Sequence, residues 1–225
     1  MSTDIRLVVL DMAGTTVADD GLVERAFRAA AATLGVEADS PEQQRMLEHV
    51  RATMGESKIS VFRYLFGEEE KAQRANLAFE AAYHDLVDEG HCAALPGAAE
   101  AIAELRAQGR KVALTTGFSR PTQDRILAAL GWQDIADLTL CPADAGRGRP
   151  YPDMVLTALL RTATDSVRQI AVAGDTGYDM LTGTRAGAPV VAGVLTGAHT
   201  EDRLRADGAT HVLGSIAELP KLLAG

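Results

Sequence analysis

Three aspartates stand where carboxylates can do chemistry. Asp11 directly follows the apolar run 5–10, and Asp175 ends a second run, 169–174, with Asp179 four residues later. Runs this short and this rich in branched aliphatic residues predict strands that are buried on both faces. Open parallel sheets bind their ligands at the carboxyl ends of such strands. We therefore predict that the three carboxylates meet at one edge of a parallel sheet.

A hydroxyl pair and a cation are expected at the same edge. Thr115, Thr116 and Gly117 end a third predicted strand that starts at residue 111, and Arg149 lies in a loop after a fourth. Carboxylate oxygens suit Mg²⁺, which binds through one or two carboxylates and the phosphate oxygens of a ligand. A hydroxyl and an arginine can hold other phosphate oxygens, and a carboxylate can attack phosphorus. Of the two hydroxyls, we expect Thr115 to contact the phosphate, with Thr116 near it.

The elements that must position these groups fall into two kinds. Between residues 22 and 88 the apolar residues recur at helical spacing, without a convincing strand. From residue 95 onward, strands alternate with helices, which predicts a parallel sheet covered on both faces. The expected fold class is α/β, a Rossmann-like sheet with an inserted helical cap. We assign the core to residues 1–17 and 94–225 and the cap to residues 18–93.

The expected elements can be given by residue number. Ser57 is a suitable N-cap for the third cap helix, so Lys58 falls in the first turn of that helix. The cap helices are expected at 22–34, from 41, at 57–66 and at 69–87. The strands are expected at 5–10, 111–116, 138–140, 169–174, 189–194 and 210–213. The core helices are expected at 98–108, up to 130, at 152–161, at 178–186, from 200 and from 215, with a loop at 142–150.

Four motifs in this order resemble the haloacid dehalogenase superfamily across nearly the whole chain. They are Asp11-x-x-Gly14-Thr15, the strand-ending Thr115-Thr116, the cation Arg149, and Gly174-Asp175-x-x-x-Asp179. Together they are far more specific than any one of them alone. The resemblance implies a Mg²⁺-dependent hydrolase in which an aspartyl-phosphate forms on Asp11. It also implies metal ligands at Asp11, the backbone carbonyl of Ala13, Asp175 and Asp179.

Two further features resemble the phosphonatase branch of that superfamily. Ala13 stands two residues after Asp11, where most phosphatases of the superfamily carry an acid. The helical insert contains Met54-Gly55-Glu56-Ser57-Lys58. In this branch such a lysine forms a Schiff base with an aldehyde, so the resemblance implies that Lys58 is catalytic and that Met54 packs near the site. The expected substrate is phosphonoacetaldehyde or a related phosphonate.

The resemblance has local departures, and other readings stay open. Phosphonatases commonly have a histidine where this chain has Val61, a tyrosine where it has Phe118, and a cysteine near Gly21. A lysine in a first helical turn is usually an exposed surface residue. The chain can instead be a phosphomonoester phosphatase that uses a cap residue as acid and base. A binding or regulatory protein that holds a phosphorylated ligand is the third possibility.

Composition limits the class of partner. The 225 residues carry a net charge of −9, which does not favour nucleic acid or an anionic membrane surface as a partner. No stretch approaches the roughly 20 apolar residues of a membrane span, and no leader segment is recognised. Two cysteines without metal-like spacing suit a reducing compartment, so we expect a cytoplasmic protein. The expected partner is a small phosphonate or phosphate, and the resemblance implies a possible homodimer through the cap.

Overall fold

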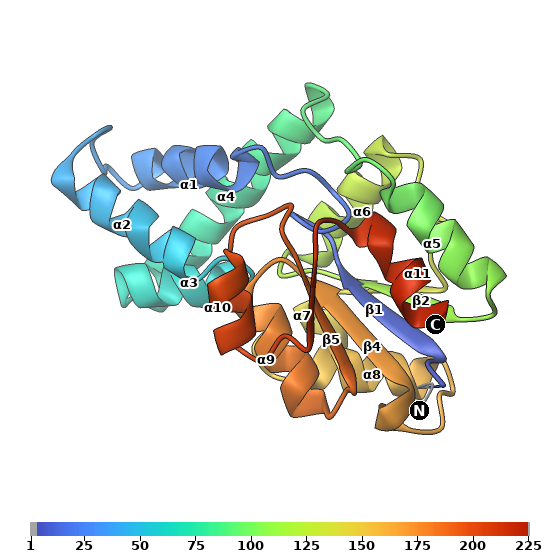
Figure 1. Cartoon of the computed structure of the whole chain (residues 1–225). Helices are drawn as coiled ribbons and strands as arrows, with labels where there is room; N and C mark the ends of the chain where they lie inside the picture. Colours follow the sequence, from blue (N-terminus) through green and yellow to red (C-terminus); the bar gives the residue numbers. More distant parts are fainter. Residues whose placement is uncertain (1–3, 225) are drawn as a thin grey trace.

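A single parallel sheet forms the centre of the molecule. The computed structural model of the chain describes residues 4–224. Its strands are β1 (Leu7–Asp11), β2 (Lys111–Thr115), β3 (Leu138–Leu140), β4 (Ile170–Gly174), β5 (Val190–Val194) and β6 (His211–Leu213). Their order is β3-β2-β1-β4-β5-β6, and every neighbouring pair is parallel. The predicted α/β class with a Rossmann-like sheet is confirmed, and the strand that carries Asp11 lies inside the sheet (Figure 1).

Alternation along β1 explains why helices cover both faces of the sheet. Val8 and Leu10 belong to the larger apolar cluster, which includes residues of α5 and α11. Leu7 and Val9 point to the opposite face, into a cluster with residues of α8 and α9. All four side chains are at most 1% exposed. Burial of each contributes roughly 1.5–3 kcal/mol to folding, which holds the end of β1 in place.

The helices of the sheet-bearing part alternate with its strands, and Figure 1 shows them on the two sides of the sheet. They are α5 (Ala98–Ala107), α6 (Arg120–Ala129), α7 (Pro142–Ala145), α8 (Asp153–Arg161), α9 (Gly177–Ala186), α10 (Glu201–Ala206) and α11 (Leu219–Ala224), with 3₁₀ turns η1 (Val167–Gln169) and η2 (Ile216–Glu218). Most predicted boundaries agree within one or two residues. The segment 142–150 was expected to be loop throughout, and this is wrong at α7, where Pro142 begins a short helix that Asp144 caps.

Four helices between β1 and α5 pack on one another beside the sheet. They are α1 (Leu22–Thr33), α2 (Pro41–Ala52), α3 (Lys58–Phe66) and α4 (Glu69–Asp88). Their shared core is aromatic: the Phe27 ring centroid lies 4.6 Å from that of Phe62 and 4.8 Å from that of Phe79. We call residues 22–88 the helical segment. In Figure 1 it extends to the upper left, away from the C-terminal helix α11.

Two linkers join the helical segment to the sheet, and they run side by side. The amide of Ala18 donates to the carbonyl of Ala93 at 2.9 Å, and the amide of Leu95 donates to the carbonyl of Thr16 at 3.0 Å. This pairing brings the residues just after β1 next to the residues just before α5. The segment between β1 and α1 is therefore held at the carboxyl edge of the sheet.

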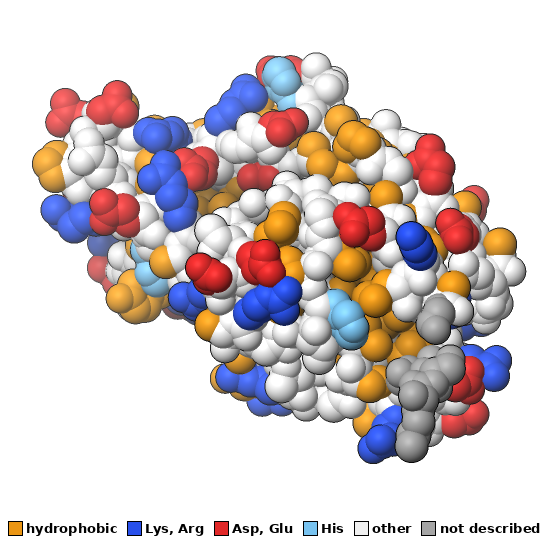
Figure 2. All heavy atoms as spheres, in the orientation of Figure 1, with side chains coloured by type: hydrophobic (Ala, Val, Ile, Leu, Met, Phe, Trp, Pro, Cys, Tyr) orange, Lys and Arg blue, Asp and Glu red, His pale blue; other side chains and the backbone are white. Residues whose placement is uncertain are grey.

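The surface carries both signs of charge. On the face drawn in Figure 2, acidic and basic side chains are interspersed. Within residues 4–224, no helix combines the length and the apolar character that a membrane crossing requires.

Candidate active site

Parallel register brings the sequence motifs together. Asp11 at the end of β1 lies beside Thr115 at the end of β2, and Leu10 lies beside Ala173, two residues before Asp175. The strand ends therefore meet at one edge, as predicted. Sequence separations of 104 and 164 residues between Asp11 and these partners become neighbouring positions because the strands are parallel.

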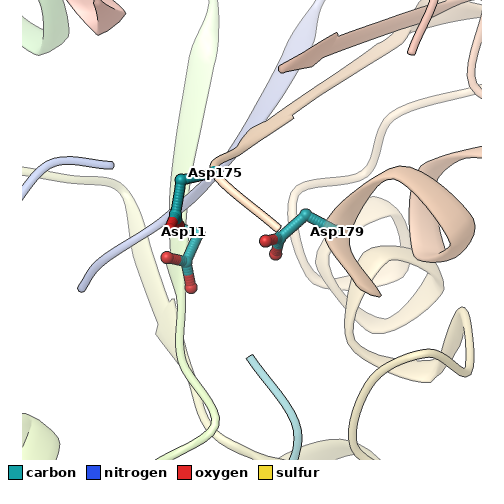
Figure 3. A group of neighbouring side chains, drawn as sticks. All are labelled: Asp11, Asp175 and Asp179. Atoms are coloured by element: carbon teal, nitrogen blue, oxygen red, sulfur yellow. The ribbon is translucent and has the colours of Figure 1, made fainter. Parts of the chain in front are cut away.

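Three buried carboxylates converge there. Asp11, Asp175 and Asp179 each offer an oxygen, and these oxygens lie within 4.8 Å of one another. The three residues are 5%, 2% and 3% exposed. Figure 3 shows the carboxyl groups of Asp11 and Asp175 side by side, with that of Asp179 directed at them from α9. The predicted convergence of the three acids is present.

Asp175 is held from two directions. Its Oδ1 accepts from the hydroxyl of Thr15 at 3.1 Å, and its Oδ2 accepts from the amide of Ala198 at 2.8 Å. Two glycines leave room for it: a Cβ at Gly14 or at Gly197 would stand 2.5 Å or 2.0 Å from Oδ2. Backbone this close to a carboxylate tolerates no side chain. The glycine of the first motif therefore makes space for the aspartate of the last.

Asp179 serves two purposes at once. As the third residue of α9 it forms a capping box with Thr176, whose amide donates to its Oδ2 at 3.1 Å. Its other oxygen lies 2.7 Å from a guanidinium nitrogen of Arg149. Asp179 therefore caps the start of α9 and contacts the cation of the site.

Arg149 is the cation of the cluster. It is 4% exposed, and its second terminal nitrogen lies 2.6 Å from an oxygen of Asp11. One guanidinium thus bridges two of the three acids, with its donors fixed in a plane. The contact with Asp11 is a close charge pair rather than an aligned hydrogen bond, because that nitrogen completes no hydrogen bond within 4–224. The loop arginine of the sequence pattern is therefore not a solvated surface residue.

The cluster retains an excess of negative charge. Burial raises the pKa of Asp11 to about 6, with Arg149 opposing the shift and Asp179 adding to it. Burial also raises the pKa of Asp175 well above its usual value, and the charges of Asp11 and Asp179 act in the same direction. Ionised carboxylates this close repel each other in a low dielectric, so a bound cation would relieve them.

These groups fit a divalent metal. Carboxylate oxygens from Asp11, Asp175 and Asp179 form a hard donor set of the kind that Mg²⁺ prefers. Ala13, the predicted backbone ligand, lines the same cavity as Asp11 and Asp175. Gly14 and Gly197 keep space beside Asp175 that a Cβ would fill.

The two threonines differ in access. Thr115 donates its hydroxyl to the carbonyl of Leu10 at 3.3 Å and is not among the cavity-lining residues found within 4–224. Thr116 and Gly117 line the cavity, and the Thr116 hydroxyl accepts from the amide of Phe118 at 3.2 Å. The cavity lining favours Thr116, and Thr115 as the phosphate contact stays a prediction. Strand alternation points Thr115 back into the sheet, and the next residue faces the ligand space.

Lys58 is buried in the cavity wall rather than exposed. It is 8% exposed, lines the cavity, and places its Nζ 5.2 Å from the ring centroid of Phe118. Burial lowers its pKa to about 8, against the charges of Asp19 and the acid cluster. Ser57 precedes α3 as predicted, but its hydroxyl makes no cap hydrogen bond with any group in 4–224. The amide of Lys58 instead faces the carbonyl of Gly117 at 3.4 Å.

One cavity of about 440 Å³ joins these groups. It is lined by residues of the sheet edge and of the helical segment, among them Asp11, Ala13, Asp175, Arg149, Thr116, Gly117, Met54 and Lys58. The motif residues therefore share one space, with Met54 partly buried against the core. Sequence analysis missed Asp19 and the segment 196–198, which also line it. Their spacing in the sequence forms no recognisable motif, because only the path of the folded chain brings them to the cavity.

Close backbone contact docks the helical segment on the sheet edge. A Cβ at Gly117 would stand 2.8 Å from the carbonyl oxygen of Glu56, and a Cβ at Gly55 would stand 2.6 Å from the hydroxyl oxygen of Thr176. Separations under 3 Å leave no space for a methyl group. The two glycines therefore allow the turn before Lys58 to approach the core closely.

The change Gly117→Ala should displace that turn. We expect kcat to fall by about 10²-fold, since a shift near 1 Å in a catalytic group has an effect of that size. The matched control is Gly109→Ala, where φ is +81° and no atom lies within 4 Å of the new Cβ. It should lower the melting temperature through backbone strain and leave kcat unchanged. Equal kcat for Gly117→Ala and wild type would contradict the docking role.

Comparisons with known proteins agree with this geometry. The sequence profile of a family described as haloacid dehalogenase-like hydrolase matches residues 5–187. A probable phosphatase, IndB of Dickeya dadantii, is 29% identical over 227 residues, covering 96% of this chain and 95% of that protein. Phosphonoacetaldehyde hydrolase of Syntrophobacter fumaroxidans is 31% identical over 198 residues, covering 81% of this chain and 70% of that protein.

Solved structures share the fold over the whole length. A phosphonoacetaldehyde hydrolase-like protein from Oleispira antarctica superposes with a TM-score of 0.83 at 25% identity, covering 99% of this chain and 92% of that chain. A hydrolase from Pseudomonas syringae superposes with a TM-score of 0.84 at 23% identity, covering 97% and 98%. The chain therefore belongs to the haloacid dehalogenase-like hydrolase family, as a phosphatase- or phosphonatase-like enzyme.

Proposed function

We propose that this enzyme is a Mg²⁺-dependent phosphonatase that hydrolyses the phosphorus–carbon bond of phosphonoacetaldehyde or a closely related phosphonate aldehyde. One observation carries the proposal: a buried lysine with a lowered pKa, Lys58, lines the same cavity as the buried Asp11. The residue two after Asp11 is Ala13, which cannot transfer a proton. The names of relatives such as the Syntrophobacter enzyme support this substrate class.

Asp11 is the proposed nucleophile. A carboxylate oxygen of Asp11 attacks phosphorus and forms an aspartyl-phosphate. Arg149, which already faces Asp11 at 2.6 Å, and Thr116 hold the phosphoryl oxygens. Mg²⁺, held by Asp11, the carbonyl of Ala13, Asp175 and Asp179, would screen the charge between carboxylate and phosphoryl group.

Lys58 is the proposed electron sink. Neutral Nζ adds to the aldehyde carbon, the carbonyl oxygen leaves as water, and a protonated imine remains. When the Asp11 oxygen attacks phosphorus, the phosphorus–carbon bond breaks and its electron pair forms the carbon–carbon double bond of an enamine. The imine π pair moves onto the Lys58 nitrogen. Cleavage of the phosphorus–carbon bond releases no oxygen leaving group that must be protonated. This route therefore needs no acid at the position of Ala13.

The second half of the reaction regenerates the free side chains of Asp11 and Lys58. Water attacks the phosphorus of the aspartyl-phosphate, which releases phosphate and the Asp11 carboxylate. Protonation of the enamine carbon and addition of water to the imine release acetaldehyde and Lys58. Closure of the helical segment on the sheet edge, through Gly55 and Gly117, excludes bulk water during these steps.

A phosphomonoester phosphatase is the second candidate. It is favoured by the likeness to the probable phosphatase IndB, of which this chain covers 95%. In that case Lys58 would donate a proton to the leaving oxygen instead of holding an aldehyde. The two candidates share Asp11, Arg149 and the metal ligands, so only the substrate and the role of Lys58 separate them.

The test is phosphate release from a panel of phosphonate aldehydes, phosphonates without a carbonyl, and phosphate esters. We expect turnover of the aldehydes only, with loss of that turnover after chelation by EDTA and recovery with Mg²⁺. Metal dependence follows from the excess charge of the Asp11, Asp175 and Asp179 cluster. Faster turnover of esters than of any aldehyde would favour the phosphatase. Full activity in excess EDTA would contradict the metal role.

Organisation and location also belong to the proposal. We assign the core to residues 1–17 and 94–225 and a cap to residues 18–93, supported by the grouping of α1 to α4. A homodimer through the cap is supported by Tyr64 and Leu77, which are 73% and 65% exposed on it. Sedimentation of wild type and of a Tyr64→Glu variant tests the dimer. The two free cysteines support a cytoplasmic location, which cell fractionation tests.

A further inference from the structure

Apolar side chains line part of the cavity that holds Lys58. They include Val23, Met54, Leu95 and Phe118. Imine formation moves protons onto and off oxygen, so it needs a group that titrates near neutral pH. None of the five histidines of the chain is among the lining residues, all of which lie within 4–224. The proton-transfer group must therefore be sought among the carboxyl groups.

Asp19 is the carboxyl group that geometry favours. It lines the cavity, is partly buried, and directly follows Ala18, whose amide is bonded to the linker partner Ala93. Its Oδ1 accepts from the amide of Val23 at 3.2 Å, in the first turn of α1. Within residues 4–224, Oδ2 makes no hydrogen bond and Asp19 forms no ion pair. One oxygen therefore holds the group still while the other is left for a ligand.

The other nearby acids are engaged or face elsewhere. Glu24 forms a bidentate pair with Arg51, at 2.6 Å and 2.7 Å. Asp20 lines the cavity but is exposed to solvent. Burial raises the pKa of Glu56, with Tyr178 and the charge of Lys58 opposing, but Glu56 is not among the lining residues. Of the carboxyl groups outside the metal cluster, Asp19 alone is partly buried, unpaired and in the cavity wall.

Buried aromatic residues pack beside Lys58 in the cavity wall. The ring of Tyr83 is fully buried, with its centroid 4.7 Å from that of Phe118, over which Lys58 lies. The Tyr83 hydroxyl has no partner within 4–224, and the charge of Asp19 helps to raise its pKa after the larger effect of burial.

The electrostatics agree with this placement. Burial raises the pKa of Asp19, with the Val23 amide and the charge of Lys58 opposing, and with Asp20 and Glu24 adding a smaller rise. After burial, which lowers it, the charge of Asp19 is the largest influence on the pKa of Lys58, ahead of Arg149, Asp11 and Asp175. A carboxyl group with a raised pKa beside an amine with a lowered one can exchange a proton at little cost.

We propose that Asp19 is the proton-transfer group for imine formation and hydrolysis at Lys58, an inference that rests on the proposed phosphonatase function. As the Lys58 nitrogen–carbon bond forms, the carbonyl π pair moves to oxygen, which takes the proton of the Asp19 carboxyl. The carboxylate then removes a proton from nitrogen and returns it to the hydroxyl, and the carbon–oxygen bond breaks to release water. The nitrogen lone pair forms the C=N bond, so the protonated imine carries the remaining charge.

The test uses acetaldehyde as a probe that needs neither phosphonate nor metal. Cyanoborohydride reduces the imine, and mass spectrometry of the peptide that contains Lys58 gives the rate of ethylation. We expect Asp19→Asn to lower this rate by about 10²-fold. The amide oxygen of asparagine can still accept from the Val23 amide, so the start of α1 is preserved. The control Glu56→Gln, which removes a carboxylate outside the cavity wall, should keep the wild-type rate.

The pH dependence separates proton transfer from simple electrostatics. Loss of the Asp19 charge lowers the pKa of Lys58 further, so more of the amine is neutral at pH 7. A purely electrostatic Asp19 would therefore make Asp19→Asn react faster than wild type at pH 7, and that result overturns the inference. A slower reaction across the whole range of pH, with an unchanged melting temperature, supports it.

The outcomes also distinguish the inference from the function on which it rests. If wild-type Lys58 is not ethylated, the Schiff-base function fails and the role of Asp19 fails with it. If Lys58 is ethylated equally fast in wild type and in Asp19→Asn, the function stands and the role of Asp19 alone is overturned.

Discussion

Asparagine in place of Asp11 is expected to lower the rate of phosphate release by about 10⁴-fold or more, because removal of a nucleophile has effects of that size. The amide matches the carboxylate in shape, so Arg149 and the strand end keep their positions. It is a poor nucleophile and cannot form the aspartyl-phosphate. Single-turnover release of phosphate, with enzyme in excess over substrate, measures the chemical step directly.

The folded state should tolerate this change. In the metal-free protein the raised pKa of Asp11, about 6, means that the folded state holds its proton more tightly than the unfolded chain does. Ionisation of Asp11 therefore lowers the free energy of unfolding progressively as pH rises from about 4 to 6. The full reduction is present above about pH 6. Asp11→Asn removes this contribution, so its melting temperature at pH 7 in EDTA should not lie below that of wild type.

A matched surface variant completes the experiment. Asp165 is exposed at the opposite end of the sheet, next to η1 and β4, and Asp165→Asn should keep full activity. Phosphate release by Asp11→Asn within tenfold of this control would rule out Asp11 as nucleophile. Loss of activity together with a large drop in the melting temperature would instead place the role of Asp11 in folding.

Methionine in place of Lys58 is the second change with a large expected effect. It fills a similar volume beside Phe118 but has no amine, so the proposed electron sink is lost. We expect turnover of a phosphonate aldehyde to fall by at least about 10³-fold, in the range of catalytic-residue knockouts. Ethylation of the peptide that contains position 58, by acetaldehyde and cyanoborohydride, should disappear together with that turnover. Undiminished turnover of the phosphonate aldehyde by Lys58→Met would contradict the proposed imine intermediate.

The stability of the folded state should rise in the Lys58→Met variant. Burial lowers the pKa of Lys58 from 10.5 to about 8, so the charged lysine destabilises the folded state by roughly 3 kcal/mol below pH 8. The unfolded chain binds more protons than the folded one between pH 8 and 10.5, so this loss is relieved as pH rises through that window. Lys58→Met should therefore raise the melting temperature at pH 7, by less at pH 10.

The same pKa sets the pH profile of wild type. The neutral amine is the nucleophile, so the rate at which Lys58 reacts with an amine reagent that needs no proton donor, such as fluorodinitrobenzene, should rise tenfold per pH unit below about 8 and level off above it. A rate that still rises tenfold per pH unit between pH 8 and pH 10 would contradict the burial of Lys58.

Most of the fold follows from local signals in the sequence. The aliphatic runs at β1 and β4 have only one way to bury both faces, which is inside a parallel sheet. Glycine and capping residues then set most helix ends, as at Ser215 and Glu218 before α11. The helix α7 inside 142–150 was missed, because its short turn depends on a capping aspartate and has no apolar period.

The site could be predicted only in part from the sequence. Parallel strands end at one edge, so the meeting of Asp11, Asp175 and Arg149 follows from chain order alone. The choice between Thr115 and Thr116 does not, since it depends on where the pleat of β2 ends relative to the cavity.

The sequence by itself therefore determined which chemical groups meet, since strand pairing and motif order are local properties that repeat along the chain. Only the tertiary structure decided how those groups behave. Lys58 is buried because Gly117 and Phe118, about 60 residues away, pack against it, and Asp19 lines the same cavity because the linkers pair. A pKa depends on hydration and on charges a few ångströms away, whatever their distance along the chain.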